Sequence, residues 1–554
     1  MNFKNSLLTP ISLWGDFDDS LPLKSTTVSK IKVDGAVISE VYFSGRAVGN
    51  ERVRIFGYYS VPDDVSPKGA ILYIPNDDEK IGSDTFKEFL SVGYAVLAID
   101  VYGKREGSVN HTEYPTAVYY ANAVSAGRRK DFVDESAKET CWYEWVAVGR
   151  YAVKYLKEIG FDSICLAGNK IGANVGWQIA AFDKTVTCFI AMFGAGWTAY
   201  KNVCKFDENA KEPIEADDSS RKYVAAVDAH AYAPYVRCPI LYLTSTNSTF
   251  FDFDRAGDTL SRVNDGVPCF TSYSVGYDSH LDVNAKIDAL AFLESYIGNE
   301  SQINLKRVNL ACKQEGNKLR FEADSGNLKA KSVCVYVNEG VKYASKRDWA
   351  RYEASMDESG KYSVLYAIEG KGLVFAFCSV EFADGTVFCS KEIFKKVEKT
   401  SDKKLSSKLV YSSKKGLNGL TFIDDESSVS IFADKTIEEI DGPDGIVGAY
   451  SQSGLLSFKF SDPDFSLTDA SILKFDAFVN EYCPLTLTLY EDDGEIKKYS
   501  FTQELKSENI WQNILVKISD FKSDVGFVVK NYDKVFALSI KSDAKFVINN
   551  VLII

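Results

Sequence analysis

Residues 1–302 alternate short apolar runs with segments whose apolar residues recur at helical spacing. The apolar runs, each short enough for one strand, are residues 69–75, 94–100, 163–168, 186–194 and 238–246. The segments with helical spacing are residues 85–93, 143–160, 173–182 and 282–298. Buried strands separated by amphipathic helices favour a mainly parallel sheet with helices on both faces. We therefore predict an α/β domain over residues 1–302.

The pattern then changes to short runs in which apolar and polar residues alternate at the period of a strand. Residues 303–396 hold several such runs, and Asp384-Gly385 has the composition of a tight hairpin turn. This segment is predicted to be a small all-β sandwich.

A polar and charged stretch, residues 397–408, is interpreted as a linker. Beyond it, residues 409–554 continue in strand-and-turn spacing. Leu485, Leu487 and Leu489 alternate with threonines there, as in a strand with one buried face. The prediction for the 554 residues is therefore an α/β domain followed by two all-β sandwich domains.

Charge and hydropathy exclude several classes of partner. Asp and Glu (77) outnumber Lys and Arg (64), and the net charge of −13 disfavours nucleic acid, whose phosphates need clustered cations. No apolar stretch approaches the ~20 residues of a membrane helix, so we expect no membrane partner. The first residues lack a basic segment followed by an apolar run, which indicates a cytoplasmic protein without a signal peptide; secretion stays open if a leader precedes this sequence.

Cysteine and histidine usage argues against a bound metal. The 11 cysteines include no Cys-x-x-Cys pair, and the chain has three histidines: His111, His230 and His280. We therefore expect no zinc site and no cofactor. Cys165, Cys188 and Cys238 lie in or beside apolar runs and are interpreted as buried free thiols, which suits a reducing compartment.

Residues 166–174, "LAGNKIGAN", place two glycines, Gly168 and Gly172, on either side of Lys170. A strand-like run precedes them and a helix-like run follows, which is the context of the Gly-x-Ser-x-Gly turn that carries the nucleophile of serine esterases. Glycines suit such a turn because strand and helix approach closely there. The serine position holds a lysine, and an ordinary strand-to-helix turn remains the alternative interpretation.

The order of motifs around this turn resembles the α/β-hydrolase family, in particular its acetyl xylan esterase and dienelactone-hydrolase-like branch. The resemblance covers about residues 25–300 and rests on "VLAIDVYGKREG", "HTEYP", "AGNKIGANVGWQIAA", "PILYLTSTNSTFF" and "DSHLD". It implies a serine nucleophile at the turn, an acid after the strand that ends near residue 246, and a histidine before the last helix.

Mapped onto this chain, the three roles fall on Lys170, Ser248 and His280, so the nucleophile and the acid positions are replaced. Asp252 and Asp254 follow closely and remain open as substitute acids. A histidine with neither an oriented partner nor a hydroxyl to deprotonate has no acyl-transfer task. We expect these triad-equivalent positions to be inactive.

The loop after residues 69–75 would supply an oxyanion donor in this family, and here it reads Asn76, Asp77, Asp78. Carboxylates at that place would oppose a developing oxyanion. One hypothesis is that Lys170 pairs with Asp77 or Asp78 and closes a dead pocket. The alternative, Lys170 as a Schiff-base nucleophile, finds no carbonyl substrate or cofactor site elsewhere in the sequence.

Other candidates are weaker. His111 lies in a loop that could cover the pocket mouth, so it is a candidate substrate-binding residue, or a surface residue without a role. His230 is interpreted as structural. Four tryptophans fit either the core or the lining of a pocket: Trp142, Trp145, Trp177 and Trp197.

The β segments carry resemblances of their own. Residues 303–396 resemble the immunoglobulin-like sandwich often found after hydrolase domains. Residues 409–554 resemble jelly-roll, galactose-binding-like carbohydrate-binding modules. Aromatic rings stack on sugars, and the candidates are Tyr482, Tyr490 and Trp511, with Tyr450 and Phe521 also considered. The alternative is that these aromatics belong to the core of the sandwich.

Three functional hypotheses follow. The first is a catalytically degenerate carbohydrate-esterase-like protein that binds carbohydrate or an unidentified protein partner. The second is an active carboxylic-ester hydrolase, an acetyl xylan esterase or related deacetylase, with a non-standard site. The third is a structural or assembly protein. The oligomeric state is not predicted.

Overall fold

The computed structural model describes residues 7–33, 35–83, 85, 87–105, 107–211, 217–298, 305, 307–326, 330–356, 361–399, 408–424, 430–465 and 467–554. The chain forms two compact units. The first comprises Met1–Thr244, Phe250–Ser272 and Ile287–Arg307, and the second Ser245–Thr249, Tyr273–Lys286 and Val308–Ile554. The second unit thus includes two short loops, residues 245–249 and 273–286, that lie inside the predicted α/β domain.

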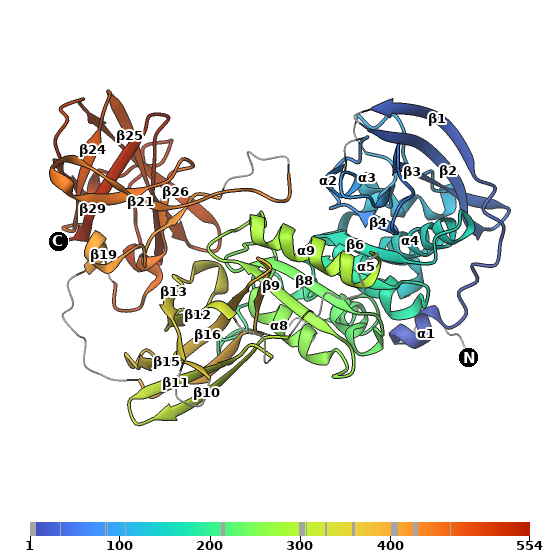
Figure 1. Cartoon of the computed structure of the whole chain (residues 1–554), viewed down its shortest axis with the longest axis horizontal. Coiled ribbons are helices and arrows are strands. Elements are labelled where there is room, and N and C mark those ends of the chain that lie inside the picture. Colours follow the sequence, from blue (N-terminus) through green and yellow to red (C-terminus); the bar gives the residue numbers. More distant parts are fainter. Residues whose placement is uncertain are drawn as a thin grey trace. The chain divides into compact units, whose positions relative to one another are not determined.

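A mixed sheet organises the first unit, in the order β1-β2-β3-β5-β4-β6-β7-β8-β9 (Figure 1). Its strands are β1 Thr26–Val33, β2 Ala36–Val48, β3 Glu51–Pro62, β4 Ala70–Ile74, β5 Ala95–Asp100, β6 Ile164–Asn169, β7 Cys188–Met192, β8 Ile240–Ser245 and β9 Cys269–Ser274. The strands β5, β4, β6, β7 and β8 pair in parallel, whereas β1, β2, β3 and β5 pair antiparallel.

The parallel strands coincide with the five apolar runs of the sequence, and every residue of β4, β5, β6, β7 and β8 is buried. Strands that are covered on both faces need apolar side chains on both, which is why these runs do not alternate. Cys165, Cys188 and Cys238 are buried free thiols beside or within them.

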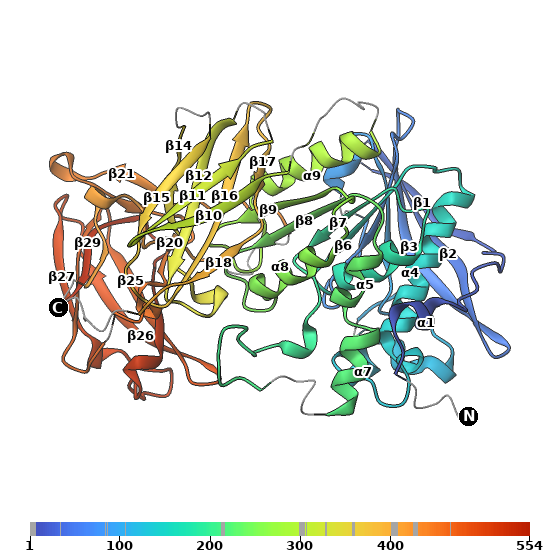
Figure 2. The same cartoon turned by 90° about the horizontal axis from the view of Figure 1, so that it is seen from below.

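Helices cover both faces of the parallel strands: α4 and α5 lie on one side and α9 on the other (Figure 2). The described helices are α1 Pro10–Trp14, α2 Lys87–Leu90, α3 Ala123–Ala126, α4 Cys141–Glu158, α5 Ile171–Phe182, α7 Asp218–Ala226, α8 Phe253–Arg262 and α9 Val283–Tyr296, the last beginning in the second unit. The hydroxyl of Thr140 caps α4 by accepting the Tyr143 N–H. Trp142, Trp145 and Trp177 are core residues, less than 5% exposed.

Residues 309–396 of the second unit form two antiparallel sheets. One has the order β10-β11-β15-β14; in the other, β12 pairs with β13 and β16, and β16 pairs with β17 and β18. The strands are β10 Asn309–Glu315, β11 Lys318–Asp324, β12 Ala330–Glu339, β13 Ala350–Glu353, β14 Ser355–Met356, β15 Tyr362–Ala367, β16 Leu373–Phe382, β17 Val387–Cys389 and β18 Ile393–Lys396.

Residues 408–554 form a further pair of sheets, here called the C-terminal β module (Figure 1). Their orders are β21-β22-β29-β24-β27, with β19 on β29, and β20-β23-β28-β25-β26. The strands are β19 Lys408–Tyr411, β20 Thr421–Phe422, β21 Glu438–Asp441, β22 Val447–Tyr450, β23 Leu455–Ser457, β24 Ile472–Val479, β25 Cys483–Asp492, β26 Ile496–Leu505, β27 Gln512–Lys517, β28 Val535–Lys541 and β29 Phe546–Ile553. Leu485, Leu487 and Leu489 are fully buried, as their alternation predicts.

A helix that spans a bilayer needs about 20 predominantly apolar residues. Among the helices that the structure describes, none is both long and apolar enough to cross a membrane. The predicted domain boundaries at 302, 396 and 408 stay predictions.

Candidate functional site

Lys170 occupies the apex of a sharp turn between β6 and α5. Its backbone has φ +53° and ψ −112°, a left-handed conformation that side chains other than glycine adopt only under strain. The Lys170 N–H donates to the carbonyl oxygen of Met192 at 2.8 Å, which holds the turn against β7. A strained residue between a strand and a helix is the backbone geometry of a nucleophile elbow.

The glycines of this turn lie where no side chain fits. A Cβ at Gly168 would lie 2.5 Å from the Gly172 carbonyl oxygen, and one at Gly172 only 2.2 Å from the Ile74 carbonyl oxygen. A Cβ at Gly194, after β7, would lie 2.1 Å from the Lys170 carbonyl oxygen. The neighbouring atoms are backbone, so they cannot move aside cheaply.

The Lys170 side chain is partly exposed, and its ammonium lies 5.8 Å from the centre of the Phe193 ring. It forms no ion pair with any residue in the described part of the chain. The expected pairing with Asp77 or Asp78 is therefore wrong. Asp77 pairs with Lys130, and the Asp78 carboxylate accepts the side-chain N–H of Asn76.

Two backbone N–H groups beside Lys170 are already engaged by side chains. The Ile171 N–H donates to Asn76 Oδ1 at 3.1 Å, and the Asn76 N–H donates to Glu79 Oε2 at 3.1 Å. They belong to the residue after the elbow apex and to the loop after β4, the two places that supply an oxyanion hole in serine esterases. Asn76, one of the predicted loop residues, thus takes part in both interactions: its side chain accepts one of the two N–H groups, and its backbone provides the other.

Glu79 is a functional candidate that the sequence analysis missed. Its carboxylate accepts the Tyr73 hydroxyl at 3.0 Å and the Asn169 side-chain N–H at 3.2 Å, in addition to the Asn76 N–H. Burial raises the pKa of Glu79, and the three donors oppose this rise. Its position three residues after Asn76, in "NDDE", was the available signal.

The segment "VLAIDVYGKREG" contributes a further contact to Glu79. Arg105 donates to the backbone carbonyl of Glu79 and lies 3.5 Å from the Asp100 carboxylate. Asp100 in turn accepts the N–H groups of Tyr102 and Thr112, at 3.0 and 2.8 Å. Burial raises the pKa of Asp100. The motif therefore has a structural task.

His111 follows this segment in a loop and is partly buried. Its Nδ1 is buried and has no hydrogen-bond partner among the residues that the structure includes. Its expected role in substrate binding stays a prediction. His230 is buried, stacks on Trp197 at 4.1 Å between ring centres, and lies 3.4 Å from Asp228 Oδ1.

The positions considered for the acid have other environments. Asp252 caps α8: its Oδ1 accepts the N–H groups of Asp254 and Arg255 at 3.0 and 3.2 Å. Asp254 is buried within the first turn of that helix. Ser248 is buried in the loop 245–249 of the second unit.

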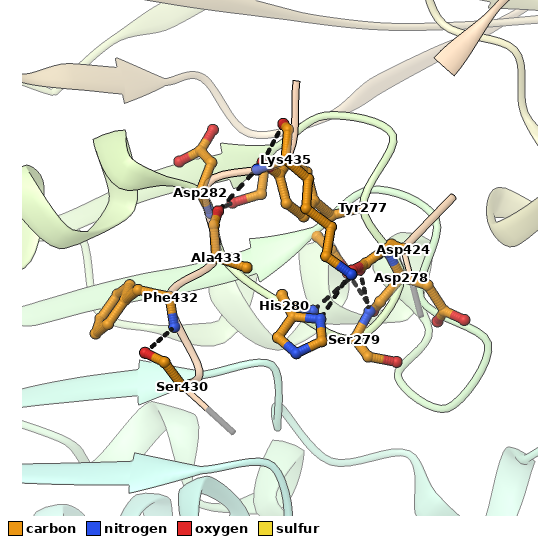
Figure 3. A network of polar contacts seen from close by, with 12 residues as sticks. Tyr277, Asp278, Ser279, His280, Asp282, Asp424, Ser430, Phe432, Ala433 and Lys435 are labelled. Carbon is orange, nitrogen blue, oxygen red and sulfur yellow. Dashed lines mark hydrogen bonds and ion pairs between the residues drawn. The ribbon is translucent and has the colours of Figure 1, made fainter. Parts of the chain in front are cut away.

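The carboxylate partner of His280 is Asp424, in the C-terminal β module (Figure 3). His280 Nδ1 lies 2.8 Å from Asp424 Oδ1, and the Lys435 ammonium lies 3.0 Å from the same oxygen. The expectation that His280 lacks an oriented partner is therefore wrong. No pattern in the sequence links two residues that stand 144 positions apart.

Asp424 also holds the backbone of the loop that carries His280, residues 277–282, here called the histidine loop. Its Oδ2 accepts three consecutive N–H groups, those of Asp278, Ser279 and His280, at 2.8, 2.8 and 3.2 Å. Burial alone would raise the pKa of Asp424, but the hydrogen bond and charge of His280, the Ser279 N–H and Lys435 together lower it to about 2. The carboxylate is thus ionised at neutral pH.

Residues 430–435, here called the strap, run beside the same loop (Figure 3). The Leu281 N–H donates to the Ile431 carbonyl at 2.9 Å, and the Ala433 N–H donates to the Leu281 carbonyl at 2.8 Å. The Tyr277 hydroxyl donates to the Lys435 carbonyl at 2.7 Å and accepts the Lys435 N–H at 3.0 Å.

The candidate sugar-binding aromatics have different surroundings. Tyr482 is 58% exposed. The Tyr490 hydroxyl lies 3.2 Å from Ser539 Oγ, and Trp511 donates to the Pro443 carbonyl while its ring covers Gly442 and Gly448. Carbohydrate binding at these rings stays a prediction. Within the described part of the chain, no group of three His, Cys, Asp or Glu side chains is placed to hold a metal ion.

Comparisons with known proteins find similarity to about half of the chain, at the level of structure. No family model and no curated protein sequence matches the chain. Among solved structures, it is similar to the acetyl xylan esterase from Paenibacillus sp. R4 (14% identity, 52% of this chain and 92% of that one, TM-score 0.38). It is also similar to acetyl xylan esterase 1 from Thermoanaerobacterium sp. JW/SL YS485 (14%, 53% and 95%, TM-score 0.38) and to the α/β hydrolase GrgF from Penicillium sp. sh18 (16%, 47% and 99%, TM-score 0.32).

Proposed function

We propose that this chain is a catalytically degenerate, carbohydrate-esterase-like α/β-hydrolase protein that binds a carbohydrate or a partner protein instead of cleaving an ester. The proposal rests on the two N–H groups beside Lys170, which are engaged by Asn76 and Glu79. An oxyanion hole needs such donors for the charge that develops in the transition state, and each contributes about 3–4 kcal/mol.

Charge and chemistry at the same place support the proposal. Glu79 puts a carboxylate where an esterase would stabilise an oxyanion. Lys170 offers no hydroxyl for an acyl intermediate of the serine-esterase kind. The strained turn of a nucleophile elbow is therefore present, but it lacks the nucleophilic hydroxyl that such a turn presents in an active esterase.

An active ester hydrolase is the second candidate, and one observation favours it. The His280–Asp424 pair has the base-and-orienter arrangement of a hydrolytic triad. Such an enzyme would need another hydroxyl or an activated water as its nucleophile.

Hydrolysis of p-nitrophenyl acetate and of acetylated xylo-oligosaccharides by the full chain separates the two candidates. We expect no turnover above that of a His280→Ala variant. Turnover that disappears in His280→Ala would overturn the proposal in favour of the active enzyme. Calorimetric titration with deacetylated xylo-oligosaccharides then tests the carbohydrate ligand directly.

Repair of the elbow gives a sharper prediction. Lys170→Ser alone should stay inactive, because Asn76 and Glu79 still engage the oxyanion donors. Lys170→Ser combined with Asn76→Gly and Glu79→Ala frees both donors and should gain slow turnover of p-nitrophenyl acetate, with circular dichroism as the control for folding. Activity of Lys170→Ser alone would contradict the assigned role of Asn76 and Glu79.

A further inference from the structure

Asp424 is surrounded by hydrogen-bond donors. Three backbone N–H groups reach its Oδ2, and His280 Nδ1 and the Lys435 ammonium reach its Oδ1. The Asp424 side chain is 2% exposed and that of Lys435 is 10% exposed, so these contacts are shielded from water. Charged hydrogen bonds in such surroundings are short and directional.

The environment of Asp424 decides which nitrogen of His280 carries the proton. An ionised carboxylate has no proton to donate and can only accept. The contact of 2.8 Å between Asp424 Oδ1 and His280 Nδ1 is therefore a hydrogen bond donated by the imidazole. In the neutral ring the proton is on Nδ1 and the lone pair on Nε2, which is the form that can accept a proton.

We propose that Asp424 is the positioning residue of His280: the C-terminal β module supplies the carboxylate that fixes the tautomer and the ring orientation of this histidine. Ser248 stands where the resemblance to esterases places that carboxylate, and the module compensates for the replacement. The inference goes beyond the proposed function, because it concerns the state of His280 whether the chain cleaves esters or only binds a ligand.

The strap helps to hold the His280 ring in a fixed position against Asp424, although the two residues are far apart in the sequence. Its backbone bonds to Leu281 and its contacts with Tyr277 hold the loop at residues before and after His280. Lys435, at the end of the strap, adds a positive charge next to Asp424 and keeps the carboxylate ionised. Asp424 and Lys435 thus act on His280 together.

Nuclear magnetic resonance of the imidazole nitrogens tests the proposal, because the chain has only three histidines to assign. The full chain, labelled with ¹⁵N in its histidine rings, is measured at about pH 9, where an imidazole is neutral. His111→Gln and His230→Gln variants assign the signals. We expect His280 to carry its proton on Nδ1.

Asp424→Asn should reverse this tautomer. The three backbone N–H groups of residues 278–280 require the amide oxygen at the Oδ2 position, so the amide NH₂ faces His280 Nδ1 and forces the proton onto Nε2. Asp424→Glu keeps a carboxylate and should retain the Nδ1 proton. Asp282→Asn is the matched control and should change nothing: Asp282 is a partly buried carboxylate of the same loop, and none of the described hydrogen bonds joins it to the His280 ring.

A wild-type His280 protonated on Nε2, or an Asp424→Asn variant that keeps the proton on Nδ1, would overturn the proposal. A tautomer change in Asp282→Asn as large as that in Asp424→Asn would overturn it as well, since the effect would then be a general disturbance of the loop. If Asp424→Asn does not fold, the wild-type spectrum alone decides between the two tautomers.

Discussion

At the scale of single residues, Lys170 combines a strained backbone with a side chain that has no ion pair in the described part of the chain. Its positive φ costs about 1–2 kcal/mol relative to a residue that tolerates this region. We predict that Lys170→Gly raises the free energy of unfolding of the first unit by about 1 kcal/mol, after the entropic penalty of glycine. Urea titration monitored by fluorescence measures the change.

Lys184 provides the control for this substitution. It lies in an exposed turn and is not among the residues with positive φ. Lys184→Gly should lower the stability slightly, because glycine only adds disorder to the unfolded chain. An equal effect of both substitutions would show that the strain at Lys170 is negligible.

The lowered pKa of Asp424 predicts that the stability of the protein depends on pH. Its pKa in the folded chain, about 2, is below the ordinary value of 3.8, so the stabilisation is complete above about pH 4 and is lost as the pH falls through about 2. This shift corresponds to about 2 kcal/mol. The stability difference between wild type and Asp424→Asn should therefore shrink between pH 5 and about pH 2, as measured by urea titrations at each pH. A difference that stays constant over this range would contradict the assignment.

At the scale of elements, the β6–α5 turn depends on close backbone contact. Gly172→Ala should destabilise the first unit by about 3 kcal/mol or more, because its Cβ would meet the Ile74 carbonyl at 2.2 Å. A Cβ added at Gly257, inside α8, would have no neighbouring atom within 4 Å, and Gly257→Ala should instead stabilise by about 1 kcal/mol. Thermal unfolding of the two variants gives the comparison. Similar losses in both would show that the turn tolerates a side chain.

Some of these elements could be predicted from the sequence, because their signals are local. The runs that became β4 to β8 were predictable because strands buried on both faces require continuous apolar residues. The glycine spacing around Lys170 predicted the turn for a similarly local reason. The contacts of Asp424 and of the strap with residues 277–282 were not predictable, since one carboxylate and a few backbone hydrogen bonds leave no periodic pattern in the sequence.

At the scale of the whole molecule, the histidine loop depends on residues far along the chain. We predict that a variant ending at residue 399, which lacks Asp424 and the strap, exchanges the amide hydrogens of residues 277–282 at least about tenfold faster. Hydrogen exchange measured by mass spectrometry provides the readout, and protection of β6 and β7 reports that the first unit is still folded. Unchanged exchange in residues 277–282 would contradict the dependence.

The place of β29 in its sheet has a consequence for biosynthesis. β29 pairs with β19, β22 and β24, and its residues follow all three partners in the sequence. During translation β19, β22 and β24 leave the ribosome before residues 546–553. The sheet can therefore form completely only after β29 has been synthesised. Until then β19, β22 and β24 each lack the strand that β29 provides, so the nascent module exposes open strand edges up to the last step of its synthesis.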